Sequence, residues 1–178
     1  KKEILNILMN QNHEFLEDEV PYTLNPGGPN HEELSCLIGI YEYFENLYNH
    51  HYGGKKLPIH KKIKKVNELI SNHESKIGNL LLKYLDNKKN ITVIGKKRIR
   101  NKDRAPTISF IHKKISSKIL SQRLVKNGIA TRNDNFYAWR CLDFHKISTE
   151  DGVVRISMVH YNTLKEVHKL IKILDKIL

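Results

Sequence analysis

The C-terminal segment from Gly152 to Leu178 limits the fold of this chain more than any other part of the sequence. Apolar and polar residues alternate through Val153–Val159, and Arg155 stands among the polar ones. This period predicts a β-strand with one buried face. Thr163 and Glu166 then have the spacing of a capping box, and apolar residues follow at helical spacing. The segment therefore predicts a strand that leads into a capped helix.

An arginine on such a strand has two interpretations. Its guanidinium is a planar fork that suits a carboxylate, so Arg155 is a candidate for binding an acidic group of a substrate. Alternatively, Arg155 is a surface arginine or is paired with an aspartate or glutamate. The spacing alone favours neither interpretation.

The first part of the chain has the apolar periodicity of helices. We expect helices over Lys1–Glu19, from Asn30 to Gly53, with Asn30 as N-cap, and from Pro58 to Asp86. Between the first two lies a loop rich in proline and glycine, residues 21–30. Its glycines precede a helix, where free backbone N–H groups suit a phosphate or another anion. A plain tight turn would have the same composition, and we favour it on this evidence alone.

The pattern changes after about residue 72. A helix is expected from Ser116 or Ser117 to Asn127-Gly128. Four short strands are expected at Ile91–Ile94, Pro106–Ile111, Ile129–Arg132 and Val153–Val159. We therefore predict an α+β fold, in which a short mixed or antiparallel sheet is packed by helices.

The net charge of +12 raises the question of nucleic-acid binding. Of the 31 basic residues, 24 are lysine, a bias that an AT-rich genome would produce. The basic loop from Lys96 to Arg104 has no interleaved aromatic residues on which bases stack. We therefore interpret it as a solvated hairpin and expect only non-specific attraction of polyanions.

Other features limit the class of protein. No run of about 18 apolar residues is present, so we expect no membrane span. Lys1 is not an initiator methionine and no signal segment follows it, so we expect a fragment of a longer protein. Two cysteines, Cys36 in a predicted core position and Cys141, suit the reducing cytoplasm. The histidines have no carboxylates at ligand spacing, so we expect no metal site.

Several motifs together resemble the class V aminotransferase family, in its cysteine desulfurase-like branch. They occur in the family's order and are listed here as they stand: PGGPN at 26–30, RAPTISF at 104–110, GIATRNDNFYA at 128–138 and VVRISMVHYNT at 153–163. The family contains fold-type I enzymes that use pyridoxal 5'-phosphate. The resemblance covers roughly residues 21–178 and corresponds to the family's C-terminal portion. It implies a homodimer, a cytoplasmic transferase or lyase, and an amino acid substrate.

The resemblance also implies roles for individual residues. Arg155 matches the arginine that holds the substrate's α-carboxylate, and Asn135 and Tyr137 would line the substrate cleft. Gly27 and Gly28 match the loop that reaches the phosphate of the cofactor in the neighbouring subunit. The family's threonine is replaced by Gly28, so only backbone N–H contacts would remain.

Two departures from the family pattern bear on the chemistry. Tyr137 stands where desulfurases carry their cysteine, and a phenol with a pKa of about 10 does not accept sulfur as a thiolate does. Cys141 lies four positions later and would need a different loop shape. No segment matches the context of the Schiff-base lysine, so this chain supplies no catalytic residue and should not catalyse alone.

These observations lead to a two-part interpretation. Residues 1–71 would be the end of the large domain with connecting helices, and residues 72–178 would be the small domain that folds over the substrate. The alternative is a non-enzymatic scaffold or partner-binding domain derived from the family. A third hypothesis, nucleic-acid binding through the basic loop, is the least favoured.

Overall fold

The computed structural model describes residues 2–16, 19, 22–25, 27–100 and 103–178. The chain forms two compact units, residues 1–63 and 64–178. Pro26 of the loop and Lys102 of the basic segment lie outside the described residues.

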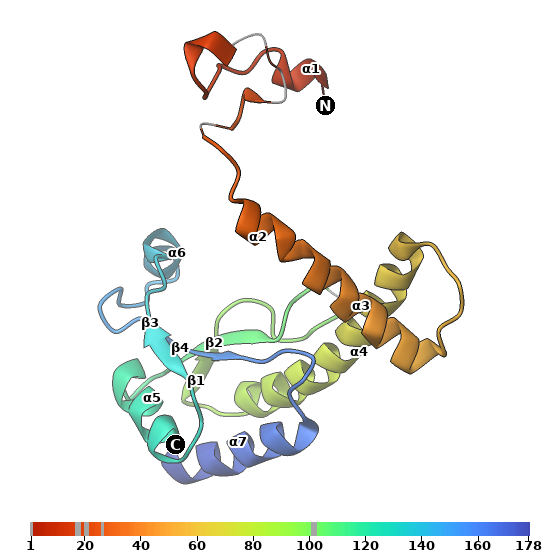
Figure 1. The fold of residues 1–178 in the computed structure, drawn as a ribbon. Helices are drawn as coiled ribbons and strands as arrows, with labels where there is room; N and C mark the ends of the chain where they lie inside the picture. The colour runs from red at the N-terminus through yellow and green to blue at the C-terminus, as the bar shows by residue number, and fades with distance from the viewer. Residues whose placement is uncertain (1, 17–18, 20–21, 26, 101–102) are drawn as a thin grey trace. The chain divides into compact units, whose positions relative to one another are not determined.

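The second unit is built around a four-stranded antiparallel sheet in the order β1-β2-β4-β3 (Figure 1). Its strands are β1 (Ile91–Val93), β2 (Thr107–His112), β3 (Arg132–Asp134) and β4 (Val153–Ser157). The predicted α+β fold with a small sheet is confirmed, and the sheet is antiparallel throughout. The strand with the clearest alternation, β4, lies in the interior of the sheet between β2 and β3.

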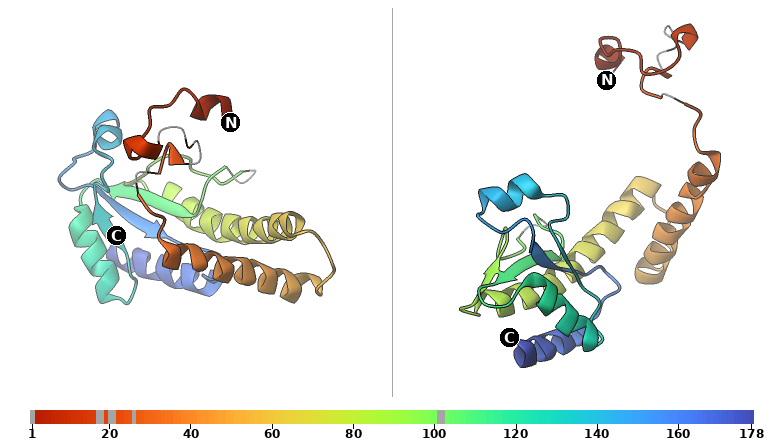
Figure 2. Two further views of the ribbon diagram at one scale, coloured as in Figure 1. Left: turned by 45° about the horizontal axis from the view of Figure 1, so that its top comes forward. Right: turned by 90° about the vertical axis from the view of Figure 1, so that its left-hand side faces the viewer.

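Helices cover one face of this sheet, as both views in Figure 2 show. They are α4 (Ile59–Asp86, of which residues 64–86 belong to this unit), α5 (Ser117–Lys126) and α7 (Leu164–Ile177). The sheet contributes Ile108, Phe110, Val154 and Ile156 to the core between them. Since alternate strand residues point to opposite faces, Ser109, Arg155 and Ser157 point away from these helices.

Local signals account for the ends of the helices. Ser116 caps α5, and its side chain accepts a hydrogen bond from the backbone N–H of Ile119. Thr163 and Glu166 form the complete capping box at α7, as predicted. The Glu166 carboxylate accepts a hydrogen bond from the Thr163 backbone N–H at 2.6 Å, which holds the glutamate's pKa below its ordinary value.

The third strand differs from the prediction, which placed it at Ile129–Arg132. The observed β3 starts at Arg132, because the preceding residues are bonded to α5 instead of β4. The Ile129 N–H donates to the Leu124 carbonyl, and the Ser121 hydroxyl lies 3.1 Å from the Thr131 hydroxyl. A short helix that the sequence analysis did not predict, α6 (Trp139–Phe144), follows β3.

The first unit contains the remaining elements. They are α1 (Lys2–Leu5), the 3₁₀ turn η1 (Glu14–Leu16), α2 (His31–Ser35), α3 (Leu37–Tyr52) and the start of α4. As predicted, Asn30 caps the helix that follows it, and α4 begins after Pro58. Tyr48 is the buried aromatic residue of α3, and its ring stacks on Tyr52 with centroids 5.2 Å apart.

The prediction of a helix over Lys1–Glu19 is wrong. Among the described residues of this segment, only the four-residue helix α1 and the turn η1 form. Between them, asparagine side chains bond to the backbone. Asn10 Oδ1 accepts from the Asn12 N–H at 3.0 Å, and Asn12 Oδ1 accepts from the His13 N–H at 2.7 Å. Such local side-chain bonds compete with helix formation.

The predicted core position of Cys36 is also wrong. Cys36 is exposed and lies between α2 and α3, so the helix expected from Asn30 to Gly53 is divided there. Its thiol donates to the Glu32 carbonyl at 3.4 Å. Cys141 on α6 is exposed as well.

Candidate functional site

Arg155 occupies the middle of the sheet's outer face. It lies opposite Ser109 of β2 on one side and opposite Arg132 of β3 on the other. Its side chain is partly buried. Antiparallel pairing puts directly opposite side chains about 5 Å apart at Cβ. The outer face therefore places two arginines and a serine at neighbouring positions on three adjacent strands.

The ring of Phe136 fixes the Arg155 side chain. The guanidinium carbon lies 3.8 Å from the ring centroid, a cation–π contact. Among the described residues, no aspartate or glutamate forms an ion pair with Arg155. The structure therefore does not support the alternative of an arginine neutralised by an internal carboxylate.

A loop between β3 and β4 carries Phe136, and its two ends are held close together. The Asn135 amide donates to the Thr149 carbonyl at 3.2 Å, and its oxygen accepts from the Tyr137 N–H at 3.0 Å. Gly152 has a φ of +63°, and a Cβ there would overlap the backbone of Asp134. The close approach of the two ends therefore requires glycine at position 152.

Phe136 and Tyr137 both have left-handed backbones, with φ of 51° and 59°. This conformation is costly for large side chains and recurs at ligand sites. It turns the Phe136 ring onto Arg155, whereas Tyr137 is fully exposed. Trp139 and Phe144, on α6, are also exposed, at 60% and 82%.

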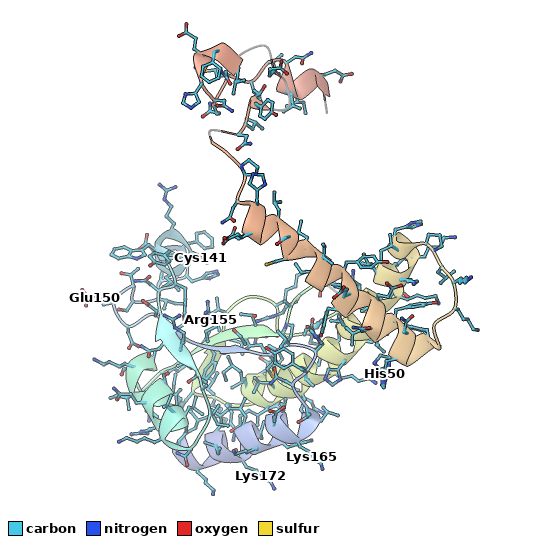
Figure 3. All side chains as sticks on the ribbon, in the orientation of Figure 1. His50, Cys141, Glu150, Arg155, Lys165 and Lys172 are labelled. Atoms are coloured by element: carbon cyan, nitrogen blue, oxygen red, sulfur yellow. The ribbon has the colours of Figure 1, made fainter. Side chains whose placement is uncertain are left out.

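The predicted site residues thus fall into two groups. Arg155, Asn135 and Tyr137 belong to the second unit. Arg155 lies on β4, whereas Asn135 and Tyr137 lie in the loop after β3, and of this loop only Phe136 has a described contact with Arg155. Cys141 lies on α6, beyond that loop (Figure 3). The stretch from Asn135 to Tyr137 was predicted to line the cleft, but the contact of Phe136 with Arg155 and the place of Arg132 opposite Arg155 were not predicted. Phe136 stands between Asn135 and Tyr137 in the motif, but its contact with Arg155 depends on the left-handed turn, which the sequence does not reveal.

Gly27 and Gly28 belong to the first unit. A Cβ added to either would meet nothing within 4 Å, and no described residue accepts a hydrogen bond from their N–H groups. Free N–H groups in an open loop fit the oxygens of a phosphate such as that of pyridoxal 5'-phosphate. The helix after the loop, α2, has only five residues and adds little dipole field.

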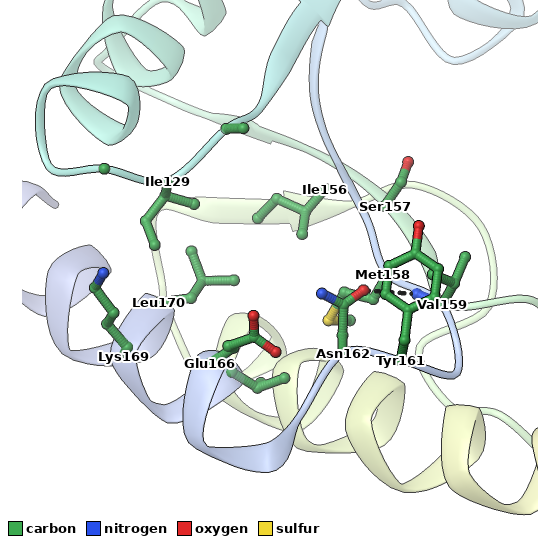
Figure 4. Close-up of a pocket in the computed structure, with 13 residues that line it drawn as sticks. Ile129, Ile156, Ser157, Met158, Val159, Tyr161, Asn162, Glu166, Lys169 and Leu170 are labelled. Carbon is green, nitrogen blue, oxygen red and sulfur yellow. Dashed lines mark hydrogen bonds between the residues drawn. The ribbon is translucent and has the colours of Figure 1, made fainter.

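A cavity of about 490 Å³ lies between α7, the end of β4 and the segment 128–130 (Figure 4). Ile156, Met158 and Leu170 contribute to its wall, so it opens on the helix side of the sheet. It forms where residues 129–131 bond to α5 and therefore do not continue the pairing of β3 with β4. Arg155 is not in its lining, so this cavity and the predicted carboxylate site are separate.

The basic loop between β1 and β2 is anchored. Ile99 is buried, and its backbone N–H and carbonyl bond to the Asn79 side chain at 2.8 and 3.1 Å. Lys96 pairs with Asp103 at 2.8 Å. The basic side chains at 96–98 and 100 are exposed, which agrees with a solvated surface, but the loop is held to α4 by its one apolar residue.

Among the described residues, no three histidine, cysteine, aspartate or glutamate side chains gather in a way that could hold a metal ion. A search of the same residues finds no helix with the length and apolar character needed to cross a membrane.

Comparison with known proteins identifies the family. The sequence profile described as aminotransferase class V matches residues 61–170, which is more than half of the chain. The chain belongs to the class V aminotransferase family. The aminotransferase-like protein FGM3 of Gibberella zeae is 34% identical over 112 residues, which are 62% of this chain and 28% of that protein.

Solved structures agree in fold. The cysteine desulfurase CsdA of Escherichia coli superposes with a TM-score of 0.61 at 18% identity, over 88% of this chain and 32% of its own. The cysteine desulfurase of Thermococcus onnurineus has a TM-score of 0.54 at 21% identity, over 67% of this chain and 29% of its own. A NifS-like protein of Rickettsia africae has a TM-score of 0.52 at 18% identity, over 65% and 31%. At these identities, the likeness concerns the fold alone.

Class V aminotransferases and cysteine desulfurases are pyridoxal-phosphate enzymes that act on amino acids and are typically dimeric. The chain spans less than a third of the length of the curated relative and of these solved chains.

Proposed function

We propose that this chain is the C-terminal portion of a pyridoxal-phosphate-dependent enzyme that acts on an amino acid, and that Arg155 binds the substrate's α-carboxylate. The observation that carries the proposal is the environment of the Arg155 guanidinium. It is held in place by Phe136 on a polar sheet face, and no carboxylate of the described residues neutralises it. A positioned guanidinium of this kind is preorganised for a carboxylate ligand.

The cofactor, when bound, would supply the electron sink that labilises bonds at the amino acid's α-carbon. In this proposal, the chain's own residues bind and orient the substrate. Arg155 fixes the carboxylate, while Asn135 and Tyr137 border the same site. Asn135 has a second task, because its amide braces the loop that carries Phe136.

Gly27 and Gly28 are proposed to contact the cofactor's phosphate in the neighbouring subunit of a homodimer. Their open surroundings support this role, as do their N–H groups, from which no described residue accepts a hydrogen bond. The boundary at residues 71 and 72 between large and small domains is part of the same proposal. So is a cytoplasmic location, which is supported by two cysteines that are both free thiols.

The reaction proposed is one at the α- or β-carbon other than sulfur transfer to an enzyme thiol. Tyr137 occupies the position of the desulfurase cysteine and is fully exposed. No lysine of this chain has the context of the cofactor-binding lysine, so we propose that the chain alone is inactive.

Arg155→Ala in the whole protein tests the carboxylate assignment. Loss of a charged hydrogen bond costs about 1.5–3 kcal/mol, so amino acid affinity should fall roughly 10- to 100-fold. Affinity for pyridoxal phosphate should change little. The measurement is a titration of amino acids against the absorbance of the bound cofactor.

Arg140→Ala is the matched control, because Arg140 is an exposed arginine on α6 and not on the sheet. This variant should bind amino acids as the wild type does. Unchanged amino acid affinity in Arg155→Ala would refute the assignment. A whole protein that binds no pyridoxal phosphate would favour the scaffold alternative.

A further inference from the structure

The basic loop between β1 and β2 is fixed to helix α4 at Ile99. The Asn79 side chain bonds to both backbone groups of Ile99, since its Oδ1 accepts from the N–H at 2.8 Å and its Nδ2 donates to the carbonyl at 3.1 Å. The Ile99 side chain is buried and lies against Gly78, where a Cβ would overlap it. A glycine and an amide on one helix therefore hold the loop, and the residues next to Ile99 have defined positions.

A pocket of about 380 Å³ lies between this loop and the C-terminal part of α4. Four cationic side chains are among its lining residues, Lys83 of α4 and Lys97, Arg98 and Arg100 of the loop. The lining also contains the carboxylate of Asp86, whose Oδ1 lies 2.6 Å from Lys97 Nζ. The other three cations form no ion pair with a carboxylate of the described residues. The pocket therefore keeps a surplus of positive charge.

The remaining lining residues restrict the class of ligand. They are Asn79, Asn87 and Ile99, and the Ile99 side chain belongs to the core. Since none of the described lining residues is aromatic, a nucleobase would find no ring on which to stack. Guanidinium forks match the oxygens of phosphate, and several cations around one pocket suit a ligand with more than one anionic group. The volume is that of a small-molecule site.

We infer that this pocket binds a small ligand that carries two or more linked phosphate groups. Arg98 and Arg100 donate to the phosphate oxygens, and Lys97 divides its charge between the ligand and Asp86. Asn79 is a positioning residue, because it fixes the backbone from which the two arginines project. Arg155 is not in the lining, so this inference is independent of the proposed function.

The test is the affinity of the whole protein for inorganic triphosphate, measured by isothermal titration calorimetry. Arg98→Gln and Arg100→Gln should each weaken binding roughly 3- to 10-fold, because each removes a charge-assisted hydrogen bond at an exposed site. Lys96→Gln is the matched control. It removes the same charge from the same loop, but Lys96 pairs with Asp103 and does not line the pocket. Its affinity for triphosphate should change less than about 2-fold.

Two further variants test the geometry of the pocket. Asp86→Asn should strengthen triphosphate binding roughly 2- to 5-fold, because it removes a repelling carboxylate and frees Lys97. Asn79→Ala should weaken binding although no charge changes. In that background Arg98→Gln should cost less affinity than in the wild type, because a released loop no longer directs the arginine. Thermal unfolding shows whether Asn79→Ala is folded, and the charge variants decide the question if it is not.

Three results would contradict the inference. Equal losses in Lys96→Gln and Arg98→Gln would show that net charge alone attracts the ligand. Unchanged triphosphate affinity in the double variant Arg98→Gln/Arg100→Gln would show that the pocket is not the site. A single-stranded oligonucleotide that binds more tightly than triphosphate, and is weakened by the same variants, would identify a nucleic acid as the ligand. None of these results affects the assignment of Arg155, which amino acid binding tests separately.

Discussion

The two faces of strand β4 differ in burial and in the kind of side chain that lies next to them. On the inner face, Val154 and Ile156 are almost completely inaccessible and are packed between helices. On the outer face, Arg155 and Ser157 retain exposure and are opposed by polar residues. One strand therefore contributes alternate residues to the core of the unit and to the candidate site.

The difference shows how stability and function are separated in this unit. The inner face gains its free energy from apolar burial, which depends on close packing. The outer face depends on charge and on the geometry of one loop. Substitutions on the two faces should consequently affect different measurements.

The largest effect on stability is expected on the inner face of β2. Phe110 is fully buried, so Phe110→Ala should lower the free energy of unfolding by about 3–5 kcal/mol. Ser109→Ala, one residue away on the outer face, should change it by less than about 0.5 kcal/mol. Chemical denaturation measures both. Similar losses in the two variants would contradict the separation of the faces.

The next largest effect is expected at Gly152, where the loop between β3 and β4 ends. Gly152→Ala combines a left-handed backbone with overlap against Asp134, so a loss of about 2–4 kcal/mol is expected. Gly128 is the control, because its φ is +74° but a Cβ there meets nothing within 4 Å. Gly128→Ala should cost only about 1 kcal/mol. A smaller loss at position 152 than at position 128 would show that the loop ends are not held as described.

The smallest effect is the pH dependence of the α7 capping box, beyond the sheet. The pKa of Glu166 is lowered, chiefly by the hydrogen bond from the Thr163 N–H, so its ionised form stabilises the folded state. This contribution is present above the ordinary glutamate pKa of about 4.3 and is lost as the pH falls through the lowered pKa. Glu166→Gln should therefore lower the unfolding midpoint near pH 7, and the difference from wild type should shrink below about pH 4.

Thr163→Ala provides the control for the capping box. It removes the hydroxyl that accepts from the Glu166 N–H at 3.2 Å. Because Thr163 and Glu166 act as one unit, the double variant Thr163→Ala/Glu166→Gln should lose less free energy of unfolding than the two single variants lose together. If the difference in unfolding midpoint between Glu166→Gln and the wild type stays constant from pH 7 to pH 3, the lowered pKa of Glu166 is contradicted.

The parts predicted correctly have signals within a few residues. The alternation in β4 and the box at Thr163 and Glu166 are local, so neither depends on distant contacts. The cap at Ser116 and the glycine that closes α5 are of the same kind. The class V family itself was identifiable from motifs in order along the chain, and the family profile confirms it.

The elements that were predicted wrongly depend on side chains that compete for backbone hydrogen bonds, or on contacts with residues outside the segment. The apolar residues of the first nineteen positions suggested a helix, but Asn10 and Asn12 bond to the backbone instead. Residues 129–131 have the composition of a strand, but their described hydrogen bonds are made to residues of α5 and not to β4. Cys36 stands in an apolar pattern and is nevertheless exposed between two helices.

The amino-acid sequence by itself determined the α+β class, through local periodicity, and the family, through motifs that occur in order along the chain. The candidate role of Arg155 came from the same resemblance, because spacing alone left it open. Only the tertiary structure decided that Arg132 lies opposite Arg155 and that Phe136 lies under its guanidinium. The physical reason is that strand register and the left-handed turn at Phe136 result from packing across the sheet. Neither leaves a mark in the local pattern of apolar and polar residues.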